Sequence, residues 1–298
     1  MVILNLQQSP STASGRLIAF TTPQNYAVRL SRLIQLNGWT PLWCPTVTVD
    51  PTPATISALQ HFFLSPNFPL RHFSALAFTS RTGIAAFSQA LAGIDAPPLS
   101  PIGEILTISA LGKDSELLDS HFIGRLCENP RRIRVLVPQL ATPSGMVEAL
   151  GLGLGRKVLC PVPVVIGLTE PPVVPKLVAD LERRGWEAVR VSAYETRWRR
   201  GGAAELVERM GEECGVDAVV FTSTAEVEGL LKSLAELGLD WGRVREMCPW
   251  MVAAAHGPVT AAGAEKLGVG IDVVSSKFDS FQGLVEALQY RWNCSEPN

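Results

Sequence analysis

The sequence predicts an α/β protein of two similar domains, each with a parallel β-sheet flanked by helices. Three observations support this prediction. They are short apolar segments rich in Val, Ile and Leu, amphipathic helical patterns between them, and a group of motifs that occurs twice. At 298 residues, the chain is long enough for two domains.

Strands are expected at nine short apolar segments, whose composition is typical of parallel strands buried on both faces. These segments are residues 17–20, 76–78, 105–109, 134–138, 157–162, 188–194, 218–221, 251–255 and 272–274.

Helices are expected between these strands. Residues 26–34, 174–181 and 227–234 carry apolar side chains three or four positions apart, which gather on one face of a helix. Strands that alternate with helices in this way favour a parallel sheet.

The duplicated group consists of three markers in the same order: a helix ending in Gly-Trp, a strand ending in Phe-Thr-Ser, and a strand ending in Gly-x-x-Ser/Thr. The corresponding first residues are Gly38 and Gly185, Phe78 and Phe221, and Gly112 and Gly257, which lie 147, 143 and 145 residues apart. Matched order and spacing indicate two related α/β units.

The last two markers also predict a binding surface, because ligands of parallel α/β sheets bind at the carboxyl ends of the strands. Free N–H groups at a helix start, with hydroxyls nearby, attract anions. Ser and Thr at these positions also cap helices without any ligand, and both interpretations stay open. Their occurrence in both units favours binding, since two such edges would frame a cleft.

Composition excludes several other classes of protein. The formal net charge is −2 without a long block of like charge, which argues against a nucleic-acid binder. No apolar run approaches the roughly 20 residues that span a bilayer, and the N-terminus lacks a secretory pattern. The six cysteines are scattered and expected to be reduced, and the four histidines lack metal-ligand spacing. These features indicate a soluble intracellular protein.

One glycine-rich stretch, GLGLG at residues 151–155, precedes a predicted strand. A dinucleotide-binding loop has to follow its strand, so this stretch is predicted to be a turn.

The motifs together resemble those of the uroporphyrinogen-III synthase family, whose members carry strand-FTS-helix and strand-Gly-x-x-Thr-helix once per domain, with a V-x-Y-x-T segment between them. The matching stretches are ALAFTSRTGIAAF, ISALGKDSELL, VRVSAYETRW, AVVFTSTAEVEGLL and AAAHGPVTAAGAEKLG. The similarity spans roughly residues 16–290, nearly the whole chain.

The resemblance implies two α/β domains joined by two extended linkers, with the chain crossing between the domains. Residues 16–41 plus 200–290 would form the first domain and residues 53–187 the second. Residues 42–52 and 188–199 would be the linkers.

It also implies the reaction, in which hydroxymethylbilane, a linear tetrapyrrole with eight carboxylates, is closed to uroporphyrinogen III with ring D inverted and water lost. This is a cyclising hydro-lyase step of haem and chlorophyll biosynthesis that uses no metal or organic cofactor. The expected partner is this substrate alone, and the protein is expected to be a monomer in the cytoplasm or a plastid stroma.

The resemblance assigns roles to individual residues as well. Tyr194 would be catalytic and assist the leaving hydroxyl, although a tyrosine that merely packs in the linker is the other interpretation. The expected substrate-binding residues are Thr79, Ser80, Arg81, Gly112, Lys113, Ser115, Thr222, Ser223, Thr224, Gly257, Val259 and Thr260.

The sequence departs from the family pattern in three places. Thr21, Thr22 and Pro23 stand where members often have Arg, Ser115 replaces a threonine, and PVPVVIG replaces a more polar Arg-Gly loop. The alternative function is therefore a non-catalytic tetrapyrrole- or anion-binding protein of the same fold.

Overall fold

The computed structural model describes residues 15–64, 69–211, 215–277 and 280–294. The N-terminal stretch that lacks a secretory pattern lies largely outside them. The chain divides into two compact units, and its crossings between them fall at Thr46–Val47 and Arg199–Arg200. Unit 1 joins the segment up to Thr46 with the segment from Arg200 onward, and unit 2 is Val47–Arg199. No helix in the described ranges has the length and apolar character to cross a membrane.

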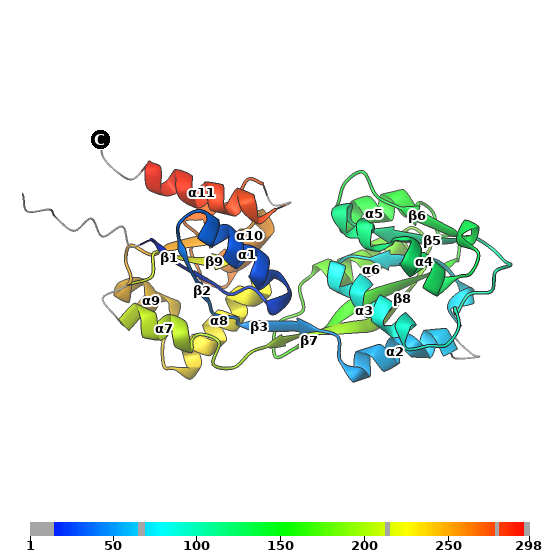
Figure 1. Cartoon of the computed structure of the whole chain (residues 1–298), viewed down its shortest axis with the longest axis horizontal. Helices are drawn as coiled ribbons and strands as arrows, with labels where there is room; N and C mark the ends of the chain where they lie inside the picture. The colour runs from blue at the N-terminus through cyan, green and yellow to red at the C-terminus, as the bar shows by residue number, and fades with distance from the viewer. Residues whose placement is uncertain (1–14, 65–68, 212–214, 278–279, 295–298) are drawn as a thin grey trace, which may run out of the picture. The chain divides into compact units, whose positions relative to one another are not determined.

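Unit 1 contains a parallel sheet of five strands in the order β11-β10-β9-β1-β2 (Figure 1). The strands are β1 (Leu17–Phe20), β2 (Thr40–Trp43), β9 (Ala218–Phe221), β10 (Val252–Ala255) and β11 (Val273–Val274). The central pair joins chain segments about 200 residues apart, since Ile18 is in register with Ala218. Figure 1 shows this as blue β1 beside yellow β9.

Helices cover both faces of the unit 1 sheet. Ile18, Phe20 and Val220 face α1 (Gln24–Leu36) and α11 (Phe281–Asn293). Ala19, Val219 and Phe221 pack in a second core with α7 (Ala204–Gly211), α8 (Thr224–Glu236), α9 (Trp241–Met247) and α10 (Pro258–Lys266). Successive side chains of a strand point to opposite faces, so the uninterrupted apolar segments serve both cores.

Unit 2 contains a six-stranded sheet in the order β3-β8-β7-β4-β5-β6, parallel except for the β3–β8 pair. The strands are β3 (Val47–Asp50), β4 (Phe73–Phe78), β5 (Leu106–Ala110), β6 (Ile133–Leu136), β7 (Lys157–Ile166) and β8 (Glu187–Trp198).

The unit 2 sheet is also covered on both faces. Leu76 and Phe78 pack with α2 (Pro53–Leu64), α3 (Arg81–Ala92) and α4 (Ser120–Leu126). Ala75 and Ala77 pack with α5 (Pro143–Leu150) and α6 (Val173–Arg183). Short 3₁₀ turns lie at Leu70–His72, Gly112–Leu117 and Pro130–Arg132.

The two sheets have the same spatial plan. The strand order of unit 2 without β3, β6-β5-β4-β7-β8, can be aligned with the order of unit 1, β11-β10-β9-β1-β2. In this alignment the two Phe-Thr-Ser strands, β4 and β9, hold matching positions, and so do the two Gly-x-x-Ser/Thr strands, β5 and β10. It also pairs α6 with α1, the two helices that end in Gly-Trp. The predicted fold class is therefore confirmed, and the unit 2 strands are a circular permutation of those in unit 1.

The nine expected strands and three expected helices are all present, but β2 and β3 were not predicted. They lie in or beside residues 42–52, expected to be a linker, and the other expected linker, 188–199, is mostly β8. Both segments are extended, and backbone pairing makes them strands: Thr40 is in register with Leu17, and Val49 with Thr196. In place of the helix expected after Gly112, the chain forms a 3₁₀ turn over Gly112–Leu117, and α4 begins separately at Ser120.

The cysteines are mostly free thiols, as expected. Burial raises the pKa of Cys44 and of Cys160 to about 12, so both are protonated at neutral pH. Cys127 and Cys294 are also free, whereas Cys248 is disulfide-bonded, so the prediction is wrong at this residue. Cys214 lies outside the described residues.

Candidate functional site

The predicted site residues lie at the carboxyl ends of the parallel strands in both units. Residues 79–81 follow β4 and residues 112–115 follow its neighbour β5 in unit 2. Residues 222–224 follow β9 and residues 257–260 follow its neighbour β10 in unit 1. In each unit, the fold therefore brings the two motif turns to the same sheet edge, beside the point where strand order reverses and ligands of such sheets bind.

In unit 2, the cap of α3 joins the predicted catalytic tyrosine. Ser80 Oγ accepts from the backbone N–H of Gly83 at 3.1 Å, so Ser80 caps the helix as expected. The same Oγ lies 2.9 Å from the hydroxyl of Tyr194, in hydrogen-bond contact. Tyr194 comes from β8 and is 6% exposed, with its ring in the unit 2 core.

Gly83 lies beside this contact. A Cβ at Gly83 would lie 3.2 Å from Ser80 Oγ and 3.7 Å from a ring carbon of Tyr194. A side chain at this position would therefore crowd the Ser80 hydroxyl, whereas it would only touch the tyrosine ring. The sequence offered no signal for this contact, because the pairing of Tyr194 with Ser80 spans 114 residues.

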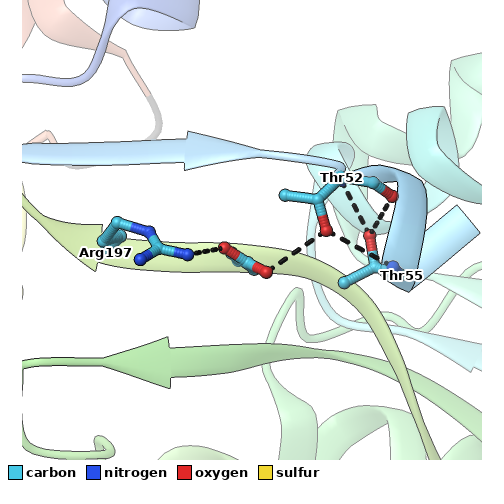
Figure 2. Close-up of polar contacts among 4 residues, drawn as sticks. Thr52, Thr55 and Arg197 are labelled. Carbon is cyan, nitrogen blue, oxygen red and sulfur yellow. Dashed lines mark hydrogen bonds and ion pairs between the residues drawn. The ribbon is translucent and has the colours of Figure 1, made fainter.

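A polar network fixes the neighbouring residues of β8 (Figure 2). Glu195 accepts hydrogen bonds from Thr52 Oγ1 at 3.2 Å and from the guanidinium of Arg197 at 2.6 Å. Thr52 also exchanges hydrogen bonds with Thr55 at the start of α2. The strand segment that carries Tyr194 is therefore held by α2 as well as by β7 and β3.

The two motif turns of unit 2 supply one exposed cation each, Arg81 from the first and Lys113 from the second. Arg81 is exposed and forms an ion pair with Asp114 at 3.7 Å. Burial raises the pKa of Asp114, while Arg81 opposes that shift. Lys113 is exposed, and Ser115 Oγ donates to the carbonyl of Gly112 at 2.7 Å, so this hydroxyl closes its own turn.

In unit 1, a carboxylate that the sequence analysis missed occupies the Phe-Thr-Ser turn. Glu226 is 1% exposed, and its side chain accepts from Thr21 Oγ1, from the N–H and Oγ1 of Thr222, and from Ser223 Oγ. Ser223 in turn caps α8 by accepting from the Glu226 N–H at 3.4 Å. Burial is the largest influence on Glu226 and raises its pKa, against the lowering effect of these hydrogen bonds.

A signal for Glu226 was present in the sequence. Ser223-Thr224-Ala225-Glu226 has the S-x-x-E spacing of a capping box, in which the glutamate folds back toward the helix start. What the motif does not predict is the bond to Thr21, which comes from the other end of the chain.

The remaining predicted residues of unit 1 mostly contact their own unit. Thr260 is 7% exposed, and its Oγ1 donates to the carbonyl of Thr222 at 3.3 Å. Thr224 packs against Gly263 of α10. Gly257 precedes α10 without a side-chain cap, and Val259 is 81% exposed.

Other candidate features contribute no site. Gly151–Gly155 forms the predicted turn before β7, and Gly153 lies against the backbone of Gly185 and Trp186. In the described part of the chain, no group of three His, Cys, Asp or Glu could hold a metal ion. A cavity of about 720 Å³ between β11 and α11 includes none of the predicted site residues.

Comparison with known families decides the relationship. The model of the family described as uroporphyrinogen-III synthase HemD matches residues 124–286, more than half of the chain. This chain belongs to the uroporphyrinogen-III synthase family. The matched range includes β8 with Tyr194 and both motif turns of unit 1.

Solved structures of this family share the fold. A mutant uroporphyrinogen III synthase from the extremely thermophilic bacterium Thermus thermophilus is 18% identical with a TM-score of 0.57, covering 94% of this chain and 100% of that one. The uroporphyrinogen-III synthetase from Helicobacter pylori is 15% identical with a TM-score of 0.53, covering 93% and 99%. No curated protein matches the sequence.

Proposed function

We propose that this protein is a uroporphyrinogen-III synthase that closes hydroxymethylbilane to uroporphyrinogen III, with ring D inverted and one water lost. The observation that carries the proposal is the Tyr194–Ser80 hydrogen bond at the unit 2 sheet edge, in a chain of the synthase family. The phenol stands beside a polar hydroxyl at the end of β4, the part of an α/β sheet where ligands bind.

The proposed reaction requires an acid that protonates the departing hydroxyl and a site that orients the two ends of the bilane. A tyrosine phenol can donate its proton to the departing hydroxyl, which leaves as water. The resulting electrophilic carbon is attacked by an already substituted pyrrole carbon, and the spiro intermediate then fragments and recloses. Holding the two ends of the bilane together is mainly an entropic task, which can account for about 7–11 kcal/mol of a barrier.

Carboxylate binding would fall to motif turns in both units. In unit 2, Arg81 and Lys113 are exposed cations that complement an octa-acid, and the turn around Thr79 and Gly112 adds neutral donors. In unit 1, the uncapped start of α10 at Gly257–Val259 supplies backbone N–H groups at a positive helix end.

The reaction as proposed needs no metal or organic cofactor, which makes the protein a cyclising hydro-lyase of tetrapyrrole biosynthesis. The working form is a monomer in the cytoplasm or a plastid stroma. Its partner is the linear tetrapyrrole alone.

The deciding experiment is incubation of the purified protein with freshly generated hydroxymethylbilane, followed by separation of the type I and type III isomers. We expect type III product in excess over a protein-free blank, rising with protein concentration. An isomer distribution identical to the blank at all concentrations would refute synthase activity.

A non-catalytic tetrapyrrole-binding protein is the second candidate. It is favoured by the burial of Tyr194 and by the internal hydrogen bonds of Thr222, Ser223, Ser115 and Thr260, which leave these hydroxyls engaged within their own units. Saturable binding of uroporphyrinogen III without any type III formation would support this candidate.

A further inference from the structure

The side chain of Glu226 is held like a bound carboxylate ligand. Oε2 accepts from Thr21 Oγ1 and from the Thr222 N–H, both at 2.9 Å. Oε1 accepts from Thr222 Oγ1 and, at 3.1 Å, from Ser223 Oγ. A carboxylate offers about four acceptor positions, so this cage leaves none open.

The donors of the cage come from both strands at the reversal point of the unit 1 sheet. Thr21 directly follows β1, and Thr222 and Ser223 directly follow β9, the neighbour of β1. This is where a ligand of a parallel α/β sheet is expected, and a substrate carboxylate would need the same donors. Thr46 also holds the backbone of Glu226 in α8, because its Oγ1 donates to the Glu226 carbonyl at 2.8 Å.

The equivalent position in unit 2 has the opposite character. Glu226 is the third residue of α8 after its cap Ser223, and Gly83 is the third residue of α3 after its cap Ser80. Gly83 has no side chain to reach the cap hydroxyl, which instead contacts the phenol of Tyr194. In unit 1, the corresponding cap hydroxyl donates to the carboxylate of Glu226.

We propose that Glu226 is an internal carboxylate ligand that closes the Phe-Thr-Ser turn of unit 1, so that this turn binds no acidic group of the substrate. Of the two Phe-Thr-Ser turns, only that of unit 2 engages the substrate. The first half of this proposal concerns the protein alone. The second half rests on the proposed synthase function. The third position after the cap thus determines which of two related turns is open.

The cage surrounds the Glu226 carboxyl group without a cation. Its donors are three hydroxyls and one N–H, and burial raises the pKa of Glu226 while no charged group contributes. A hydroxyl can reverse its role and accept, but the Thr222 N–H can only donate. An acceptor is therefore required at the Oε2 position, whichever residue or molecule supplies it.

Chemical replacement of the carboxylate tests the first half. Glu226→Ala removes the carboxylate together with one methylene, and acetate is small enough to restore a carboxylate in the space left. We expect Glu226→Ala to melt roughly 5–10 °C below the wild type, because buried donors lose their acceptor. Sodium acetate should recover at least half of that loss saturably, whereas sodium chloride at equal ionic strength should not.

Two variants serve as controls. Glu228→Ala removes a carboxylate from the same helix, one that pairs with Lys232 at 3.0 Å outside the cage, and its melting should not respond to acetate. Glu226→Gln can still present an oxygen to the Thr222 N–H, so it should melt closer to the wild type than Glu226→Ala. Two outcomes would show that the cage is not an occupied carboxylate site: acetate raises the melting temperature of the wild type as much as that of Glu226→Ala, or it raises the melting temperature of neither protein.

Kinetics with hydroxymethylbilane test the second half. Thr21→Val removes a cage donor and should lower the melting temperature while changing KM by less than about twofold. Ser80→Ala, in the open turn, should raise KM or lower kcat instead. A Thr21→Val protein with unchanged melting and a KM raised about tenfold or more would overturn the proposal. A wild type that forms no type III product would refute the synthase function, and the acetate experiment would still decide whether the turn is closed.

Discussion

Tyr194 shows how a single residue combines a packing role with a chemical one. Its ring is part of the unit 2 core, and its hydroxyl reaches the cap of α3. The packing interpretation and the catalytic interpretation are therefore not exclusive: the core holds the ring, and Ser80 holds the hydroxyl.

Tyr194→Phe separates the two roles, because it keeps the ring and removes only the hydroxyl. We expect a stability loss of about 1 kcal/mol, the usual value of one hydrogen bond. If the phenol is the acid, type III formation should fall about 100-fold or more. Thermal melts and product analysis on the same sample measure both, and full activity in Tyr194→Phe would rule out the phenol as the acid.

Glu226 predicts how stability depends on pH. Its folded pKa is raised, so its contribution is complete below the ordinary glutamate value of about 4.3 and is lost as pH rises through the raised folded value. Urea unfolding from pH 4 to pH 8 should show the wild type losing stability relative to Glu226→Gln over that range and then levelling. Parallel curves for the two proteins would contradict a raised pKa.

Thr260→Ala tests the role of the second turn of unit 1. The hydroxyl is buried and donates to the Thr222 carbonyl, so its removal should cost about 0.5–1.5 kcal/mol of folding stability. Turnover of hydroxymethylbilane should stay within about twofold of the wild type. A loss of turnover at unchanged melting temperature would instead assign the hydroxyl to the substrate.

At the scale of elements, the packing of α8 against α10 depends on a glycine. A Cβ at Gly263 would lie 2.1 Å from Thr224 Oγ1 and 2.9 Å from Thr224 Cβ, and a β-branched side chain has little freedom to move away. The two helices that follow the motif strands β9 and β10 therefore approach each other through this residue pair.

Gly263→Ala should destabilise the protein by about 1–3 kcal/mol, and adding Thr224→Ala should recover much of the loss. Denaturant unfolding of both single variants and the double variant gives the coupling free energy between residues 263 and 224. Gly124→Ala is a suitable control, because nothing lies within 4 Å of its Cβ position in α4 and the helix should gain up to about 1 kcal/mol. Additive effects of the two substitutions would mean that this contact does not set the helix approach.

At the scale of the whole molecule, each unit has its own cores. The two clusters around the unit 2 sheet draw only on residues between Val47 and Arg199, and the two clusters around the unit 1 sheet draw only on the rest. Unit 2 is also continuous in sequence, whereas unit 1 needs both ends of the chain.

A protein consisting of residues 47–199 should therefore fold alone, as a domain of ordinary size with a complete sheet. Far-UV circular dichroism and a cooperative thermal transition would show this. Residues 200–298 without residues 1–46 should not fold, because β1 pairs directly with β9. A 47–199 fragment that lacks a cooperative transition would mean that its two cores are insufficient.

Patterns in the sequence were enough to predict the α/β class, nine of the strands and the duplicated plan. These features are local: apolar composition specifies a buried strand, helical spacing specifies an amphipathic helix, and Ser80 and Ser223 cap the helices that follow them. The sequence missed β2 and β3, because mixed segments such as TPLW and VTVD become strands only through the partners they pair with.

The contacts that distinguish the two turns depend on how the chain folds in three dimensions. Tyr194 meets Ser80 from 114 residues away, and Thr21 reaches Glu226 from 205 residues away. Such hydrogen bonds have no periodic signature in the sequence, because the sheet order that creates them depends on how whole strands pair. Two motifs that look alike in sequence thereby acquire different surroundings, a phenol in unit 2 and a buried carboxylate in unit 1.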